Sequence, residues 1–108
     1  MNRDVWYYLV DEQGDSFKGV GADIVSINTE SKVVHFRDAV WAKNKEGLLK
    51  GVSAVQLKVY TTKDNITDPT KEPLEVDASV NGMGEQKREA LFVVVPKKTG
   101  MWTFDIIM

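Results

Sequence analysis

The apolar run Leu91-Phe92-Val93-Val94-Val95, ended by Pro96, constrains the fold more than any other feature of this 108-residue sequence. A short run that is apolar at every position is typical of a strand covered on both faces, which lies in the middle of a sheet. Proline lacks a backbone N–H and stops further pairing at that point. The run therefore predicts a central strand near the end of the chain.

The N-terminal region has the pattern of a β-hairpin. Val5–Val10 is rich in β-branched and aromatic residues, which pack well on a pleated surface. A glycine-containing turn region follows, and residues 22–28 then alternate between apolar and polar side chains. Two strands joined in this way are expected to pair antiparallel.

The middle of the chain contains a further strand pattern. Residues 55–60 alternate strictly, so Val55, Leu57 and Val59 are expected on the buried face of a half-buried strand. Residues 61–73 are polar and proline-containing, which predicts a loop. A short strand at 74–76 and one helical turn within 84–90 complete the predicted elements of this region.

The main helix is predicted over residues 31–44. Val33, Phe36 and Val40 are spaced so that they fall on one helical face, and this face is expected to pack on the sheet. Ser31 is the expected N-cap, because its hydroxyl can accept a hydrogen bond from an N–H of the first turn.

The order strand, strand, helix, strand, short strand, strand predicts an α+β fold of the ubiquitin-like β-grasp type. We expect a mixed sheet of four to five strands with one main helix, built from residues 1–96. Residues 97–108 are expected to form a C-terminal extension. Its apolar segment Met101–Met108 alternates, which is compatible with an additional C-terminal strand.

Composition narrows the function classes. There is no cysteine, and the net charge is −2 with lysine and arginine spread along the chain. A nucleic-acid-binding domain usually carries a basic stripe, so we expect no nucleic-acid binding by this segment. No apolar stretch approaches the ~18 residues of a membrane span, and no conventional signal peptide is visible at the N-terminus.

Residue patterns for catalysis, metals and cofactors are weak. His35 is the single histidine, and its expected position on the helix points it to solvent. Asp64, Asp68 and Glu72 lie in the polar loop without the spacing of a calcium-binding loop. Glycines and serines form no phosphate-binding or nucleophile motif. We therefore expect no enzyme activity, no metal site and no cofactor.

Four segments follow one another in an order that is typical of a known family: Val33–Val40 with Lys43-Asn44, then Leu57–Tyr60, Glu72–Leu74 and Leu91–Pro96. Together they resemble the N-terminal header domain of the Crinkler family of effector proteins. Thr61-Thr62-Lys63 stands where that family ends its strand motif with Ala-Lys.

The resemblance implies a recognition or trafficking domain that precedes a variable effector domain. By resemblance, the protein would be secreted and act in the cytoplasm or nucleus of a host cell. Its partner would be a host protein or its own effector domain. These implications come from the resemblance and not from the composition of the chain.

Aromatic and apolar side chains outside the predicted core suggest a protein-interaction surface. Val34 and Trp41 are seven residues apart and lie nearly on one line of the helix. We expect them, with Tyr60, Trp102 and Phe104, to contribute to such a surface, since tryptophan is enriched at binding hot spots. Alternatively, the C-terminal segment or a loop covers the Val34–Trp41 stripe. A further alternative is a homodimer formed through the C-terminal strand or an exposed helix face.

Overall fold

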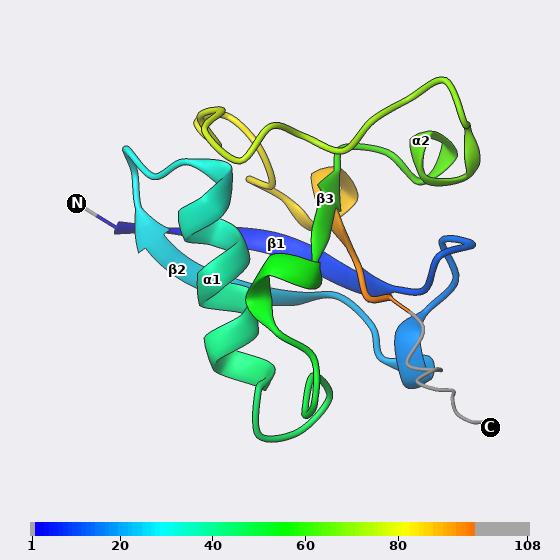
Figure 1. The fold of residues 1–108 in the computed structure, drawn as a ribbon. Coiled ribbons are helices and arrows are strands. Elements are labelled where there is room, and N and C mark those ends of the chain that lie inside the picture. The colour runs from blue at the N-terminus through cyan, green and yellow to red at the C-terminus, as the bar shows by residue number, and fades with distance from the viewer. Residues whose placement is uncertain (1, 97–108) are drawn as a thin grey trace, which may run out of the picture.

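A computed structural model describes residues 2–96 of the chain (Figure 1). The strands are β1 (Asn2–Val10), β2 (Asp23–Asn28), β3 (Lys58–Tyr60) and β4 (Leu91–Val94). The helices are α1 (Val33–Asn44) and α2 (Lys63–Thr67), with 3-10 turns η1 (Phe17–Gly19), η2 (Ala54–Gln56) and η3 (Lys87–Glu89). The additional strand considered for Met101–Met108 lies outside the described residues.

The strands form one four-stranded mixed sheet in the order β2-β1-β4-β3. β1 pairs antiparallel with β2, and β4 pairs antiparallel with β3. β1 and β4 run parallel, in a register from Tyr7 opposite Leu91 to Val10 opposite Val94. The chain therefore has the expected ubiquitin-like α+β fold, and the predicted central position of the Leu91–Val95 strand is confirmed.

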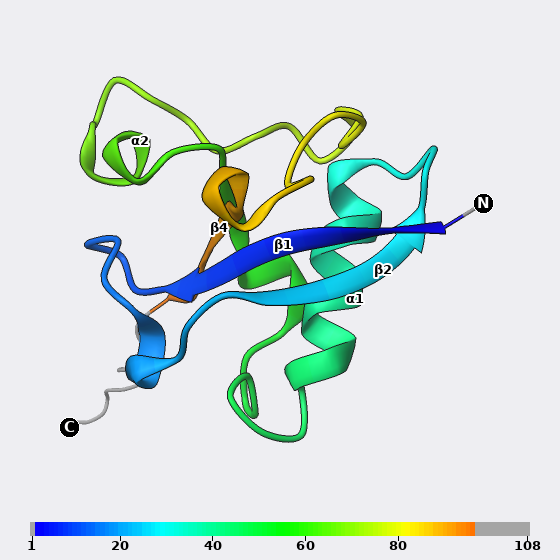
Figure 2. The same ribbon diagram turned by 180° about the vertical axis from the view of Figure 1, so that it is seen from behind.

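Helix α1 covers one face of the sheet, as the two opposite views show (Figures 1 and 2). Val33, Phe36 and Val40 are each 1% exposed or less, which confirms the predicted helix face. The Phe36 ring meets the Tyr7 ring edge to face, with centroids 6.0 Å apart. This contact joins the middle of α1 to the middle of β1 in the principal core.

The opposite face of the sheet has a smaller apolar cluster. Val10, Tyr60 and Val94 are buried there, and Ile66 of α2 packs against them. Tyr8 and Phe92 stack on neighbouring strands with ring centroids 5.5 Å apart. Cover on both faces explains why every position of β4 is apolar.

The start of α1 differs from the prediction. The N-cap is Lys32 and not Ser31, and no side-chain oxygen of residues 2–96 caps the helix. The N–H groups of Val33 and Val34 instead donate to the carbonyls of Ala78 and Val76, each at 2.8 Å. Backbone groups distant in sequence thus satisfy the first turn, so the local serine signal was misleading.

The strand predicted over residues 55–60 is also shorter than expected, because residues 54–56 form the turn η2. The Gln56 side chain accepts hydrogen bonds from the N–H and the hydroxyl of Ser53, at 2.9 and 3.2 Å. Leu57 and Val59 are buried as predicted, but the expectation for Val55 was wrong: its side chain is 76% exposed.

Residues 61–90 contain two further differences. The predicted loop includes the short helix α2, and residues 74–76 form no strand. This segment makes a single backbone hydrogen bond to β3, from the Leu74 N–H to the Val59 carbonyl at 2.8 Å. The helical turn expected within 84–90 is confirmed as η3.

Residues 80–84 cover the half of β1 that β4 does not reach. The Trp6 N–H donates to the Gly84 carbonyl at 2.8 Å. Arg3 Nη2 donates to the carbonyls of Val80 and Met83, the latter at 2.7 Å. This segment therefore continues the pairing of β1 beyond the end of the parallel ladder.

Candidate protein-interaction groove

A groove of about 190 Å³ lies between α1, β3 and residues 73–76. We call it the α1–β3 groove. Its walls come from three parts of the chain that meet only in the folded protein. It is lined by Val33 and Arg37 of α1, by Val55, Leu57, Lys58 and Val59, and by Pro73, Leu74 and Val76.

Two valines on the walls of this groove are unusually exposed. Val55 is 76% exposed and Val76 is 51% exposed, and the other large apolar side chains of residues 2–96 are buried or half-buried. Isolated exposed apolar side chains are common on protein surfaces, but grouped ones indicate interaction sites. Both valines line this one groove.

The charges that line the groove are positive. Arg37 and Lys58 contribute cations, and neither aspartate nor glutamate is among the described lining residues. The Arg37 side chain is 12% exposed, and its Nε and Nη2 both donate to one oxygen of Asp38 at 3.2 Å. A guanidinium has further N–H donors, which can still bind an acceptor.

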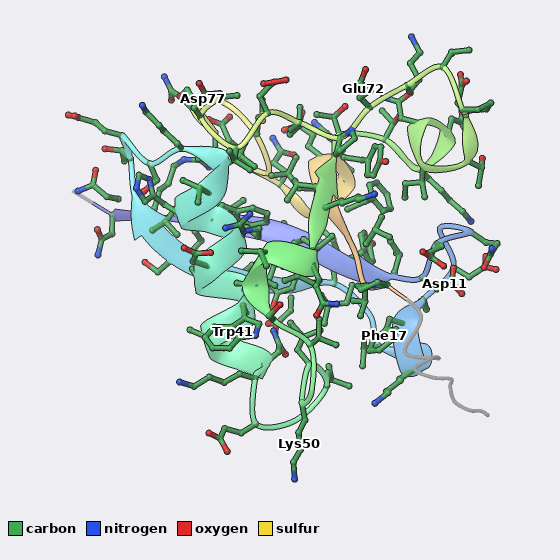
Figure 3. The ribbon with its side chains drawn as sticks, viewed as in Figure 1. Asp11, Phe17, Trp41, Lys50, Glu72 and Asp77 are labelled. Atoms are coloured by element: carbon green, nitrogen blue, oxygen red, sulfur yellow. The ribbon has the colours of Figure 1, made fainter. Side chains whose placement is uncertain are left out.

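A larger cavity, of about 270 Å³, lies near the end of the described chain. Figure 3 labels Asp11, Phe17 and Lys50 on its walls. Val95 and Pro96 also line it, and Pro96 is the last described residue.

Trp41, a predicted interaction residue, packs partly against the principal core (Figure 3). Its indole Nε1 donates to the Val52 carbonyl at 2.7 Å, and Lys45 Nζ lies 5.3 Å from the ring centroid. The loop that contains Val52 thus contacts Trp41, in line with the alternative that a loop covers this side chain.

The hydrogen bond gives a test of this packing role. Trp41→Phe should lower the free energy of unfolding by about 1 kcal/mol, because the Val52 carbonyl loses its donor. Urea unfolding of the full chain measures this difference. Trp6→Phe is the control, since no hydrogen bond from the Trp6 indole occurs within residues 2–96. Equal destabilisation by both substitutions would contradict a specific role of the Trp41 hydrogen bond.

The other predicted surface residues lie apart. Val34 is half-buried near the groove, where its N–H bonds the Val76 carbonyl. Tyr60 is 9% exposed and belongs to the cluster on the opposite face of the sheet. Trp102 and Phe104 lie outside the described residues. The structure therefore places Tyr60 apart from Val34 and Trp41, which both belong to α1, and the role of all three residues in binding stays a prediction.

Sequence reasoning did not find Val76 or Arg37 as groove residues. Val76 lies between Glu75 and Asp77. A single apolar residue between two acidic residues only weakly indicates an exposed groove residue. Val55 was placed in the core because its spacing matched Leu57. No sequence pattern indicates that residues 55–59 and 73–76 face each other.

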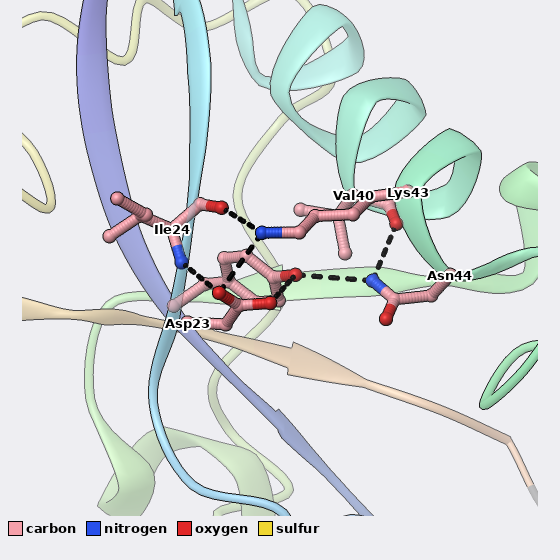
Figure 4. Close-up of polar contacts among 6 residues, drawn as sticks. Asp23, Ile24, Val40, Lys43 and Asn44 are labelled. Carbon is pink, nitrogen blue, oxygen red and sulfur yellow. Dashed lines mark hydrogen bonds and ion pairs between the residues drawn. The ribbon is translucent and has the colours of Figure 1, made fainter.

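A polar cluster ties α1 to β2 at the other side of the core (Figure 4). Lys43 Nζ donates to Asp23 Oδ1 at 3.0 Å and to the Ile24 carbonyl at 2.7 Å. The Tyr7 hydroxyl donates to Asp23 Oδ2 at 3.3 Å and accepts from Asn44 Nδ2 at 3.1 Å. Each of these four side chains thus makes at least one hydrogen bond within the cluster, which is typical of a structural contact.

The cluster shifts two pKa values. Burial raises the pKa of Tyr7 from 10.0 to about 12; the Asn44 hydrogen bond lowers it, and the Asp23 charge raises it further. Burial opposes ionisation of Asp23, but hydrogen bonds from Lys43 and the Ile24 N–H outweigh it and lower the pKa of this carboxyl. The folded protein therefore favours a neutral Tyr7 beside an ionised Asp23.

Tyr7 should consequently titrate late. Because folding raises the pKa of Tyr7, its neutral hydroxyl contributes fully to the stability of the folded state below pH 10. This contribution is lost as the pH rises through about 12. Ultraviolet difference spectroscopy of the folded chain should show a tyrosinate step near that upper value. The step should vanish in Tyr7→Phe. Complete titration of every tyrosine in the folded chain below about pH 11 would contradict the assigned environment.

His35 is exposed as predicted, and its Nδ1 accepts a hydrogen bond from the Lys32 N–H at 3.0 Å. Within residues 2–96, no group of three or more histidine, aspartate or glutamate side chains is arranged to hold a metal ion. No helix in this range is long and apolar enough to cross a membrane.

Comparison of the sequence with protein-family models and with curated proteins found no match. The α1–β3 groove is therefore identified as a candidate site from its geometry and exposed side chains alone.

Proposed function

We propose that this chain is a non-catalytic protein-interaction domain that binds a partner segment in the α1–β3 groove. The observation that carries the proposal is that Val55 and Val76, the two exposed large apolar side chains of the described region, line the same groove. Covering such side chains on binding stabilises a complex in proportion to the apolar area removed from water. Arg37 and Lys58 add polar contacts beside this apolar surface.

We further propose that the domain is the N-terminal recognition domain of a Crinkler-type secreted effector. Support comes from the position of the segments that resemble the family. Leu57–Tyr60 contributes Leu57, Lys58 and Val59 to the lining of the groove, and Glu72–Leu74 contributes Pro73 and Leu74. In this proposal the groove recognises a host protein or the effector domain of the same protein.

Single substitutions at the exposed valines test the groove. Peptides selected from a random display library against the full chain should lose affinity by about tenfold or more for Val55→Asp or Val76→Asp, because a charge replaces an apolar contact. Both variants should keep the wild-type free energy of unfolding, since these side chains are exposed. Peptide affinities are measured by fluorescence polarisation.

Gln86→Asp is the matched control, because it adds the same charge at an exposed residue that does not line the groove. It should leave peptide affinity unchanged. Failure to select any peptide that depends on Val55 or Val76 would overturn the proposed use of the groove.

The proposed effector role has a separate test. The tagged full-length protein should be secreted and then recovered from the cytoplasm or nucleus of host cells. Retention in the producing cell would contradict the effector role without affecting the binding proposal.

A further inference from the structure

We infer that Asn81-Gly82 is a site of spontaneous deamidation, and that the isoaspartate formed there loosens the contact between residues 80–84 and β1. Neither step depends on the α1–β3 groove, so the site goes beyond the proposed function. Three observations carry it: the glycine that follows Asn81, the exposed turn in which both residues lie, and the hydrogen bonds between this turn and β1.

The sequence around Asn81 favours this reaction. Deamidation of asparagine, a thermally labile residue, begins when the backbone nitrogen of the next residue attacks the side-chain amide carbon. Glycine has no Cβ and adopts a wide range of backbone angles, so its nitrogen is the least hindered. Asn81 is the one asparagine of the chain that precedes a glycine. The others precede larger residues, namely Arg3, Thr29, Lys45 and Ile66.

Asn81 and Gly82 occupy the two central positions of an exposed β-turn. The Met83 N–H closes the turn on the Val80 carbonyl at 3.0 Å, and Gly82 has a φ of +79°, which is the feature of a type II turn. Both central residues are exposed, and no heavy atom outside their immediate chain neighbours lies within 4 Å of the place that a Gly82 Cβ would occupy. Solvent therefore reaches both reacting residues.

The reacting groups are not held by hydrogen bonds within residues 2–96. The Gly82 N–H, the Asn81 carbonyl and the Asn81 side-chain amide all lack a partner there, and only the Asn81 N–H is bonded, to Ser79 Oγ at 3.1 Å. The peptide unit between the two residues can therefore rotate until its nitrogen faces Asn81 Cγ. In contrast, Asn44 Nδ2 donates to the Tyr7 hydroxyl and the Val40 carbonyl, at 3.1 and 2.8 Å.

The reaction needs water alone as co-reactant. Water or hydroxide takes the Gly82 amide proton, and the nitrogen forms a bond to Asn81 Cγ. The Cγ–Nδ2 bond then breaks as Nδ2 takes up a proton and leaves as ammonia. Water opens the resulting cyclic imide at either carbonyl carbon. Opening at Cγ gives aspartate with the original backbone, whereas opening at the backbone carbonyl gives isoaspartate, whose backbone is longer by the Cβ methylene.

The longer backbone falls where the turn is tied to β1. Arg3 Nη2 donates to the carbonyls of Val80 and Met83, which flank the reacting pair. An extra methylene between these two carbonyls changes their separation, so one Arg3 group no longer reaches both in the same geometry. Isoaspartate therefore weakens the contact of the turn with β1, whereas aspartate with its normal backbone leaves this contact in place.

Storage of the full chain in mildly alkaline buffer at physiological temperature tests the site. Labelling by protein isoaspartyl methyltransferase, followed by mass spectrometry of the digested chain, locates the isoaspartate. It should accumulate at residue 81 over days, and Gly82→Ala should lower its amount severalfold, because the added methyl group shields the attacking nitrogen. A synthetic peptide of residues 78–86 is the unstructured reference. Conversion of this peptide while residue 81 of the folded chain stays intact would overturn the site.

The loosened contact is tested on the isoaspartate-containing chain, which ion-exchange chromatography isolates because a carboxylate has replaced an amide. Its urea midpoint should be lower than that of freshly prepared Asn81→Asp, the matched control with the same charge on a normal backbone. This shift should shrink in an Arg3→Gln background, where the contact is already lost. Equal midpoints for the isoaspartate chain and Asn81→Asp would contradict the loosening of β1 and leave the site of modification standing.

Discussion

Phe36→Ala should lower the free energy of unfolding by about 4 kcal/mol, the range expected when a buried aromatic side chain is replaced by alanine. Phe36 is 0% exposed and lies between Val33 and Val40 on the buried face of α1. Its ring also loses the edge-to-face contact with Tyr7. Urea unfolding followed by tryptophan fluorescence measures the change.

Two comparisons separate this loss from a general effect of mutation. Phe36→Leu keeps most of the buried volume and should cost about 1 kcal/mol. Val55→Ala should have almost no effect, since Val55 is exposed. A loss below about 1 kcal/mol for Phe36→Ala would show that α1 does not pack on the sheet as described.

Gly84→Ala should be the most damaging of the glycine substitutions, with a loss of about 3 kcal/mol in the free energy of unfolding. Gly84 has a φ of +63°, which strains any residue with a Cβ. The added Cβ would lie 2.6 Å from Val5 Cγ1 and 3.0 Å from the Trp6 carbonyl oxygen. Val5 is 0% exposed, so neighbouring core side chains prevent it from moving away.

Gly82→Ala is the control, because it has a similar φ of +79° but no heavy atom within 4 Å of the added Cβ. It should lose only the conformational part, about 1 kcal/mol. Thermal or urea unfolding of both variants gives the contribution of the contact with β1. Equal losses would mean that residues 80–84 do not lie against β1 as closely as the structure shows.

The sequence predicted those parts of the fold that depend on residue spacing within one element. Val33, Phe36 and Val40 repeat with the period of a helix, and each of them is buried. The Leu91–Val95 run is apolar throughout because α1 covers one side of the strand and Ile66 with its neighbours covers the other. The spacing of apolar residues in these elements follows from which side chains are buried in the folded protein. Predictions from such spacing therefore agree with the tertiary structure.

The errors arose where distant segments replaced a local signal. Ser31 looked like an N-cap, but the carbonyls of Val76 and Ala78 bind the first N–H groups of α1. Val55 matched a period of two by coincidence, and the Ser53–Gln56 hydrogen bonds form a turn instead. Period alone cannot distinguish these outcomes, because it contains no information on partners far along the chain.

The candidate groove was the least predictable feature. Its walls bring together Val55 and Val76, which are separated by a strand, a helix and a loop. The prediction of a surface that includes Tyr60 assumed that side chains outside the helix face were exposed, but α2 and the stacked aromatic pair bury Tyr60. The exposed residues of a small domain thus depend on its loops, whose paths are the hardest part to predict from sequence.

The parallel pairing of β1 with β4 has a consequence for biosynthesis. β4 is the last of the described strands to be translated, yet it lies between β1 and β3. Until β4 has left the ribosome, the apolar faces of the N-terminal hairpin and of α1 lack the strand that completes the core. Long-range pairing of this kind slows folding and leaves apolar surface exposed meanwhile. We therefore expect the nascent chain to keep apolar surface exposed at least until β4 has been synthesised.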